Sequence, residues 1–131
     1  MKGVDTNVLV RYLAQDNAAQ AKAVDELVKK AVATGEPLHV DDVVLCETVW
    51  VLRAAYSQDK ASIVEVLEKV LATSQFSFDD RDLLTGALSD FRSGKGDFAD
   101  YVIGRRNRRA GCDRTVTFDR SLKGSNSFTV L

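Results

Sequence analysis

The amino-acid sequence predicts an α/β fold with a central, mostly parallel sheet flanked by helices. Short apolar segments suited to strands alternate along the chain with longer segments whose apolar residues recur at helical spacing. The 131 residues are 45% hydrophobic and 28% charged, a balance that suits one compact apolar core. We therefore expect residues 1–131 to form a single domain.

The N-terminal half is expected to alternate between strands and helices from its first residues. A short apolar strand ends at Asp5, and Thr6 or Asn7 can cap the helix that follows it. Residues 17–34 are rich in Ala, Lys and Glu and stop at Gly35, which favours a second helix. The same reasoning predicts a strand at 38–40, a helix from Asp41 or Asp42 to about Ala55, and a helix from Asp59 to about Thr73.

The C-terminal half continues this alternation. Phe76 and Phe78 alternate as they would in a strand. The segment Gly94-Lys95-Gly96 is expected to be a flexible turn, after which Asp97 opens a helix. The other expected elements are a helix from Asp79 or Asp80, the end of the Asp97 helix at Gly111, a strand at 115–118 ending at Asp119, and an edge strand at 128–131.

Charge and cysteine content exclude several classes of protein. With 18 Lys plus Arg and 19 Asp plus Glu, the net charge of -1 provides no overall basic field for nucleic acid. Residues 101–131 nevertheless hold 7 basic and 2 acidic residues, which can meet an anionic partner or form a solvated face. Two distant cysteines exclude a disulfide framework. Because no long apolar run or signal peptide is found, we expect a cytoplasmic protein without membrane spans.

Four aspartates stand near points where a predicted strand ends or a predicted helix begins. Asp5, Asp97 and Asp119 occupy such positions, and Asp100 shares a helix face with Asp97. Ligands of open parallel sheets bind beyond the carboxyl ends of the strands, so this placement favours a site. Each aspartate taken singly can also be a simple helix cap.

A fifth acid, Glu47, interrupts an apolar stretch, where a carboxylate is costly unless a cation such as Arg53 pairs with it. Together the five acids favour a hard divalent ion, Mg²⁺ or Mn²⁺.

Other kinds of site lack the residues they need. The sequence offers few ligands for zinc, because His39 is the single histidine and the cysteines lack ligand spacing. No Walker loop or GxGxxG motif is present. Four aromatic residues fall on apolar stripes and are expected in the core rather than as base-stacking platforms: Trp50, Phe76, Phe91 and Phe98.

Four short motifs follow one another along the chain. They are Val4-Asp5-Thr6-Asn7-Val8-Leu9-Val10, Glu47-Thr48-Val49-Trp50-Val51-Leu52, Asp97-Phe98-Ala99-Asp100-Tyr101 and Thr117-Phe118-Asp119. With these motifs in this order, the chain closely resembles the PIN-domain ribonucleases over essentially its whole length. It is most similar to VapC-type toxins of bacterial toxin–antitoxin pairs. The resemblance implies a PIN-like form of the predicted α/β fold.

The resemblance implies a Mg²⁺- or Mn²⁺-dependent endoribonuclease, a hydrolase that leaves 5'-phosphate and 3'-hydroxyl ends. The implied catalytic and metal-binding acids are Asp5, Glu47, Asp100 and Asp119, with Asp97 as a neighbouring metal-binding acid. Thr6, Asn7 and Thr117 match polar positions that orient carboxylates or waters. Four arginines that follow Asp100 on the same predicted helix could hold RNA phosphates: Arg105, Arg106, Arg108 and Arg109.

The implied partners are an RNA substrate, a cognate antitoxin protein and a second copy of the chain in a homodimer. One alternative is a non-catalytic RNA-binding or scaffolding PIN module whose acids hold a structural ion. A phosphatase or a phospho-accepting receiver domain is another alternative, since both place aspartates at strand ends. These two classes want a further acidic residue near the first aspartate, where this chain has Thr6 and Asn7.

Overall fold

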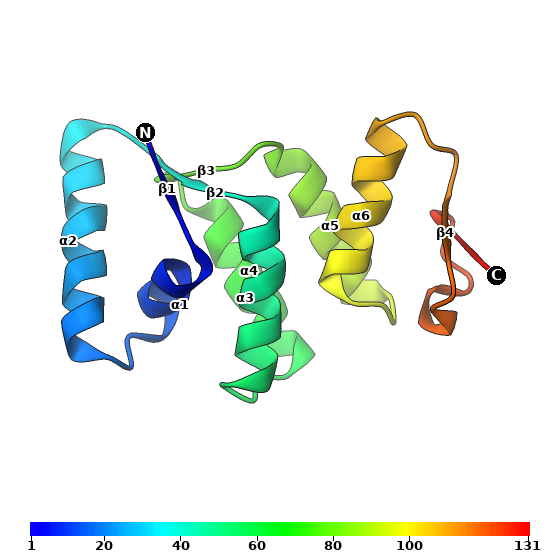
Figure 1. Ribbon diagram of the computed structural model, residues 1–131, viewed down its shortest axis with the longest axis horizontal. Helices are drawn as coiled ribbons and strands as arrows, with labels where there is room; N and C mark the ends of the chain where they lie inside the picture. Colours follow the sequence, from blue (N-terminus) through cyan, green and yellow to red (C-terminus); the bar gives the residue numbers. More distant parts are fainter. The chain divides into compact units, whose positions relative to one another are not determined.

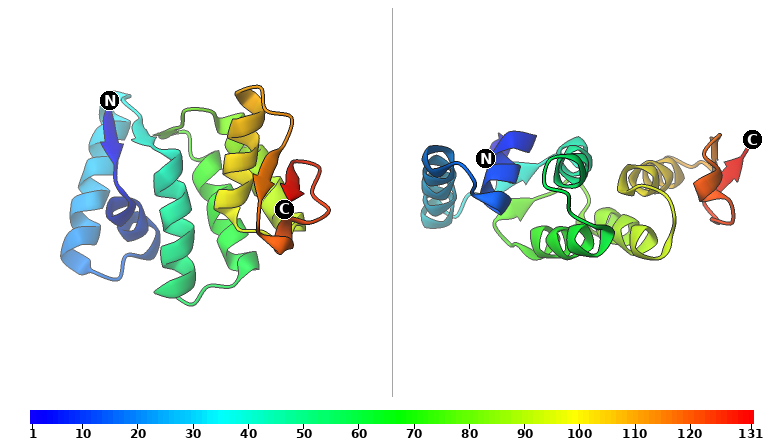
Figure 2. Two further views of the ribbon diagram at one scale, coloured as in Figure 1. Left: turned by 45° about the vertical axis from the view of Figure 1, so that its right-hand side comes forward. Right: turned by 90° about the horizontal axis from the view of Figure 1, so that it is seen from below.

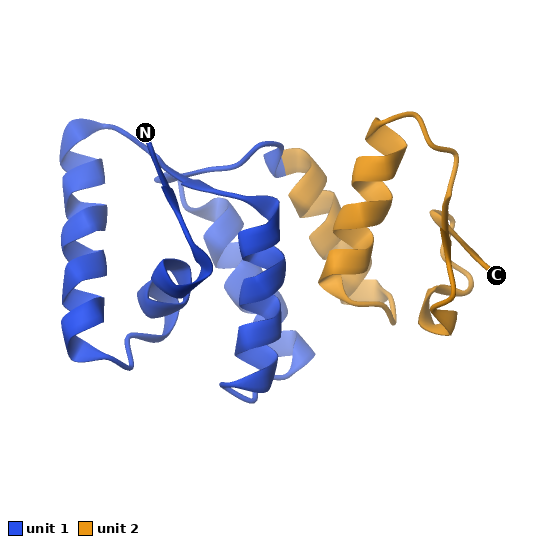
Figure 3. Cartoon of the chain, in the orientation of Figure 1, with its two compact units in different colours: residues 1–81 blue, residues 82–131 orange.

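The computed structural model describes residues 1–131, which divide into two units. Unit 1 comprises residues 1–81 and unit 2 comprises residues 82–131 (Figure 3). Figure 1 labels their helices and strands. Each unit has its own parallel strands, and the chain contains six α-helices. The predicted α/β class with parallel strands is therefore confirmed.

Unit 1 contains a three-stranded parallel sheet in the order β1-β2-β3. Its central strand pairs Leu38 with Lys2 on one side and with Phe76 on the other. In both views of Figure 2, α1 lies beside α2 and α3, which agrees with their contacts. The elements are β1 (Lys2–Val4), α1 (Thr6–Ala14), α2 (Ala18–Thr34), β2 (Leu38–Val40), α3 (Asp42–Ala54), α4 (Lys60–Ala72) and β3 (Phe76–Ser77).

One face of the unit 1 sheet faces the apolar core. Leu38, Val40 and Phe76 are buried, and the ring of Phe76 meets the ring of Tyr12 from α1 edge to face at 5.4 Å. Side chains alternate between faces along a strand, so His39 belongs to the other face. There its Nδ1 lies 3.5 Å from the Ser77 hydroxyl. His39 is thus a half-buried strand residue.

The helices of unit 1 begin at side-chain caps. The sequence places the α1 cap at Thr6 or Asn7, but the cap is Asp5, whose side chain accepts a hydrogen bond from the Val8 N–H. This prediction is wrong because helical geometry already begins at Thr6, one residue after the strand. The other caps of unit 1 are Asn17 for α2, Asp41 for α3 and Asp59 for α4. Gly35 ends α2 with a φ of 71°, a conformation that glycine adopts without strain.

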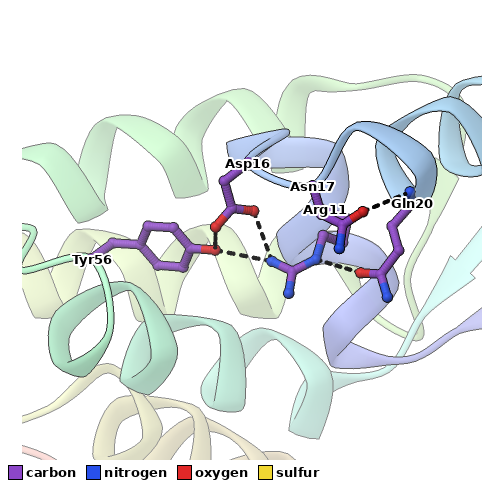
Figure 4. Close-up of polar contacts among 5 residues, drawn as sticks. All are labelled: Arg11, Asp16, Asn17, Gln20 and Tyr56. Carbon is purple, nitrogen blue, oxygen red and sulfur yellow. Dashed lines mark hydrogen bonds and ion pairs between the residues drawn. The ribbon is translucent and has the colours of Figure 1, made fainter.

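A polar network ties the loop after α1 to the loop after α3 (Figure 4). The Arg11 guanidinium donates to Gln20 at 2.6 Å, to Asp16 at 2.8 Å and to the Tyr56 hydroxyl at 3.0 Å. The Tyr56 hydroxyl in turn donates to the second oxygen of Asp16 at 2.7 Å. We call Arg11, Asp16, Gln20 and Tyr56 the Arg11 network. One cation thus satisfies the acid and orients the groups around it.

Unit 2 consists of two helices, a short 3-10 helix and a two-stranded parallel ribbon. The ring of Phe91 packs edge to face on Phe98 at 6.1 Å, and Tyr101 packs on Phe128 at 6.3 Å. The strand pairing runs from Thr115 opposite Phe128 to Thr117 opposite Val130. The elements are α5 (Arg81–Ser93), which starts at the unit boundary, α6 (Phe98–Arg109), β4 (Thr115–Thr117), η1 (Arg120–Leu122) and β5 (Phe128–Val130).

Three of the four predicted core aromatics are buried, namely Phe76, Phe91 and Phe98. Trp50 is 48% exposed, so its placement in the core is wrong. The buried stripe of α3 runs through Leu45, Val49 and Leu52. Trp50 directly follows Val49 and is turned by about 100° from it around the helix. No helix of the chain is long and apolar enough to cross a membrane.

Candidate metal centre

The first predicted acid, Asp5, lies at the junction of β1 and α1 in unit 1. It is exposed, and its Oδ1 accepts the Val8 N–H at 3.1 Å. A carboxylate at a helix N-terminus is stabilised by the exposed N–H groups and the helix dipole. One oxygen of Asp5 therefore caps the helix.

Glu47 lies on the exposed face of α3, also in unit 1. The sequence suggests that this carboxylate is buried and needs a cation such as Arg53, and the exposure of Glu47 corrects that expectation. The local sequence is apolar on both sides, but the helix directs Leu45, Cys46 and Val49 inward and Glu47 outward. Glu47 is thus accessible to a ligand and carries no burial cost.

Asp97 and Asp100 cap α6 in unit 2 reciprocally. The Oδ2 of Asp100 accepts the Asp97 N–H at 2.8 Å, and the Oδ1 of Asp97 accepts the Phe98 N–H at 2.9 Å. This capping box satisfies backbone donors at both ends of the first helical turn. The helix start therefore fixes the position of both carboxylates.

Asp119 stands at the start of η1, two residues beyond β4. Its Oδ1 accepts the Ser121 N–H at 2.9 Å and the Ser121 hydroxyl at 2.7 Å. The Asp119 N–H donates to the Thr117 hydroxyl at 3.0 Å. The hydrogen bonds from Ser121 hold the pKa of Asp119 below its ordinary value. Asp119 is therefore kept ionised and oriented by its two neighbours.

The pKa of Asp100 is raised. The largest cause is burial of the carboxylate, and the negative charges of Asp119 and Asp97 act in the same direction. Only the hydrogen bond from the Asp97 backbone opposes them. We call Asp97, Asp100 and Asp119 the unit 2 acids, because the charges of the first and the last both act on Asp100. A bound cation would relieve this repulsion.

Within unit 2, the structure brings Asp97 and Asp119 near Asp100. Asp5 and Glu47 belong to unit 1, and the unit 2 acids form the second group. Neither unit gathers three His, Cys, Asp or Glu side chains closely enough to enclose a metal ion. Thr6 and Asn7 lie in the first turn of α1 next to Asp5, and Thr117 contacts Asp119 directly.

The arginines of α6 divide into two kinds. Arg105 makes a two-pronged ion pair with Asp90 of α5, at 2.7 and 3.0 Å, and so serves the packing of the two helices. Arg108 donates to the Asp113 carbonyl, and Arg106, Arg108 and Arg109 are exposed. These three are the arginines of the set that an external phosphate can reach.

Sequence reasoning missed Ser121, which holds Asp119, and Asp90, which pairs with Arg105. The first was detectable, since a serine two residues after an aspartate at a strand end is typical of a turn that both side chains stabilise. Asp90 and Arg105 meet through the packing of α5 against α6, and no local sequence pattern predicts this ion pair.

The comparison with known proteins decides the family. The sequence pattern of the PIN domain matches residues 3–124. The chain belongs to the PIN-domain family. The match extends across both units and includes all five predicted acids. PIN domains typically bind divalent metal ions, and the α/β architecture with parallel strands is consistent with the PIN fold.

A relative of this PIN-domain chain is the VapC ribonuclease of Aquifex aeolicus (strain VF5). The two are 25% identical over 123 residues, which cover 94% of this chain and 90% of the relative. The chain is therefore a distant homologue of a VapC ribonuclease across nearly its full length.

Proposed function

We propose that this PIN-domain protein is a Mg²⁺- or Mn²⁺-dependent endoribonuclease, and the toxin of a VapBC toxin–antitoxin pair. The observation that carries the proposal is the electrostatic state of the unit 2 acids. Three carboxylates are held at the starts of two helices, where burial, and then the negative charges of Asp119 and Asp97, raise the pKa of Asp100. An arrangement of this kind is costly without a cation and useful with one.

The donor set fits a hard divalent ion, because it consists of carboxylate oxygens without thiolate or imidazole. Asp5, Glu47, Asp100 and Asp119 would hold the metal, with Asp97 as a neighbouring ligand. When bound, the ion would lower the pKa of a water and neutralise charge on the phosphodiester. The residues of the chain itself position the ligands: Ser121 and Thr117 fix Asp119, and the capping box fixes Asp100.

The substrate would be RNA, held by backbone phosphates on the exposed arginines of α6. Arg106, Arg108 and Arg109 follow Asp100 by about 1.7 to 2.5 helical turns on the same helix. Phosphate contacts of this kind position a nucleic acid without reading its sequence. In this proposal Arg105 supports the helix through Asp90 and contributes less to RNA binding.

The proposed toxin would act in the cytoplasm as a homodimer, and an antitoxin would restrain it. An acidic site beside exposed arginines offers an antitoxin peptide two charge patterns to match, and an arginine of the peptide can compete with the metal. Expression alone should then slow growth, and co-expression of the neighbouring reading frame should relieve the effect and yield an inactive complex. A harmless wild-type protein with intact metal binding would contradict the toxin role.

The nuclease proposal is tested by measuring cleavage of total RNA with added Mn²⁺. Wild type should cleave, excess chelator should stop cleavage, and Asp119→Asn should be inactive. Asp113→Asn is the matched control, since Asp113 is an exposed aspartate of the same unit outside the predicted acids. Cleavage that persists in chelator or in Asp119→Asn would contradict the metal mechanism.

A non-catalytic RNA-binding or scaffolding PIN module is the second candidate. It is favoured by one observation, which is that neither unit by itself encloses a metal site. RNA binding without Mn²⁺-dependent cleavage in the same assay would support this candidate over the nuclease.

A further inference from the structure

A polar cavity of about 430 Å³ lies within unit 2, between the end of α5 and the loop that leads into β5. Its volume is within the range of about 300–1,000 Å³ usual for small-molecule sites. The turn at Gly94 and Gly96 shapes it, because a Cβ at Gly94 would collide with the Tyr101 hydroxyl and one at Gly96 with Leu122. The Gly96 N–H donates to the same hydroxyl at 3.0 Å. Close backbone packing thus builds one wall of the cavity.

The charge of the cavity is positive. Lys95 and Lys123 line it, both are exposed, and neither makes an ion pair within the chain. The one acidic residue of the lining, Asp90, is already neutralised by Arg105. Two unpaired ammonium groups beside a neutralised acid favour an anionic ligand.

The remaining lining suits a sugar rather than a base. Ser125, Asn126 and Ser127 contribute hydroxyl and amide groups, and the Asn126 side chain makes no hydrogen bond within the protein. Such groups can donate to or accept from a ribose 2'-hydroxyl. Apart from Tyr101, whose hydroxyl is engaged by Gly96, the lining has no aromatic ring on which a base could stack.

The cavity adjoins the unit 2 acids through Ser121. This residue lines the cavity, and its hydroxyl donates to Asp119 at 2.7 Å. Tyr101, also in the lining, directly follows Asp100 on α6. A ligand in the cavity is therefore separated from a predicted metal-binding carboxylate by a single side chain.

We propose that this cavity binds the sugar-phosphate backbone of single-stranded RNA next to the phosphodiester that is cut. The inference rests on the proposed function, because we place the cleaved phosphodiester at the unit 2 acids and the adjoining part of the strand in the cavity. Lys95 and Lys123 would contact phosphates, while Asn126 and the serines would contact the ribose. The cavity is thus a second RNA contact surface, distinct from the exposed arginines of α6.

The test is the affinity of the full chain for a short fluorescent single-stranded RNA, measured in chelator so that no strand is cut. The double variant Lys95→Ala/Lys123→Ala should bind about tenfold more weakly, and its log–log salt slope should be shallower by about 1.4, for two lost phosphate contacts. The matched control Lys22→Ala/Lys29→Ala removes two exposed lysines of α2 and should leave both values unchanged.

A second variant tests the ribose contact without changing charge. Asn126→Ala should reduce the preference of the protein for RNA over DNA of the same sequence while keeping the salt slope. Unchanged affinity and slope in Lys95→Ala/Lys123→Ala would overturn the inference. An equal loss in the Lys22→Ala/Lys29→Ala control would overturn it too, because the effect would then be one of net charge.

The outcome for the cavity is separable from the outcome for the nuclease. A wild-type protein that binds RNA through Lys95 and Lys123 yet never cleaves it with Mn²⁺ would contradict the proposed function and support the cavity. A wild type that cleaves RNA, with the lysine variant binding as tightly as the control, would do the reverse.

Discussion

The Arg11 network of unit 1 and the unit 2 acids show two opposite ways of holding carboxylates. In unit 1, the Tyr56 hydroxyl and the Arg11 guanidinium bond to Asp16 and lower its pKa. In unit 2, burial and two neighbouring negative charges raise the pKa of Asp100. Asp16 is satisfied within the chain, whereas Asp100 has its charge opposed by its surroundings. The fold itself stabilises the ionised form of the first carboxylate, and we propose that the second binds a ligand.

The same substitution should therefore have opposite effects in the two regions. Asp100→Asn keeps an oxygen for the capping bond but removes the repelled charge, so we expect a higher melting temperature and at least about 100-fold less RNA cleavage. Asp16→Asn removes an acceptor of Tyr56 and Arg11, so we expect a lower melting temperature and unchanged cleavage. Thermal unfolding and cleavage rates of both variants check this. A lower melting temperature in Asp100→Asn would contradict the contrast.

The pH dependence of stability should differ between the regions in a defined direction. The raised pKa of Asp100 means that the folded state holds its proton more tightly, so stability falls as pH rises through that pKa. The lowered pKa of Asp16 means that its contribution is present above the ordinary carboxyl pKa and is lost as pH falls through the lowered value.

Tyr56 sets the upper pH limit of the stabilisation by the Arg11 network. Its hydrogen bond to Asp16 raises its pKa, so its contribution is present below the ordinary tyrosine pKa and is lost as pH rises through the raised value. Tyr56→Phe should therefore be less stable than wild type between about pH 4 and pH 10, and the two should converge outside that window. Chemical denaturation at several pH values measures the difference. A constant difference at every pH would show that the hydroxyl acts only through packing.

The arginines of α6 also divide into residues that we expect to bind RNA and one residue that we expect to stabilise the fold. Arg106→Ala/Arg108→Ala/Arg109→Ala should weaken RNA binding and make the log–log salt slope shallower by about 2, since single-stranded RNA contributes about 0.7 for each phosphate contact. Arg105→Ala should instead lower the melting temperature, because it leaves Asp90 without its partner. A salt slope that changes only in Arg105→Ala would reverse the assignment of the two kinds of arginine.

The smallest effect on stability is expected at Glu47. Because Glu47 is exposed, Glu47→Gln should change the free energy of unfolding by no more than about 0.5 kcal/mol. Its Mn²⁺-dependent cleavage should fall if the carboxylate helps to hold the metal. Loss of folding in this variant would show that Glu47 has a structural partner.

Much of the fold could be predicted because the signals are local. Asn17, Asp41 and Asp59 were all recognised as starts of helices, and the strand at 38–40 agrees with β2. Predictions failed where they depend on the exact first residue of a helix or on which face of a helix a side chain occupies. Asp5 caps α1 in place of Thr6 or Asn7 because the helix begins at once after the strand.

The site was less predictable than the fold, because it depends on the direction of individual side chains. An apolar neighbourhood in sequence suggested a buried Glu47, yet the helical rotation places it outside. The capping box of Asp97 and Asp100 follows from their spacing, but the charge of Asp119 near Asp100 is a tertiary property. The proximity of Asp119 to Asp100 cannot be derived from periodicity alone.

We propose that the Asp100 carboxylate binds a metal ion and that the Asp16 carboxylate does not. The most direct test is the shift in melting temperature when Mn²⁺ is added. Wild type and Asp16→Asn should be stabilised by the same increment, since metal binding to the folded state alone raises stability by mass action. Asp100→Asn should show no such increment. An equal Mn²⁺ shift in Asp100→Asn would contradict the account.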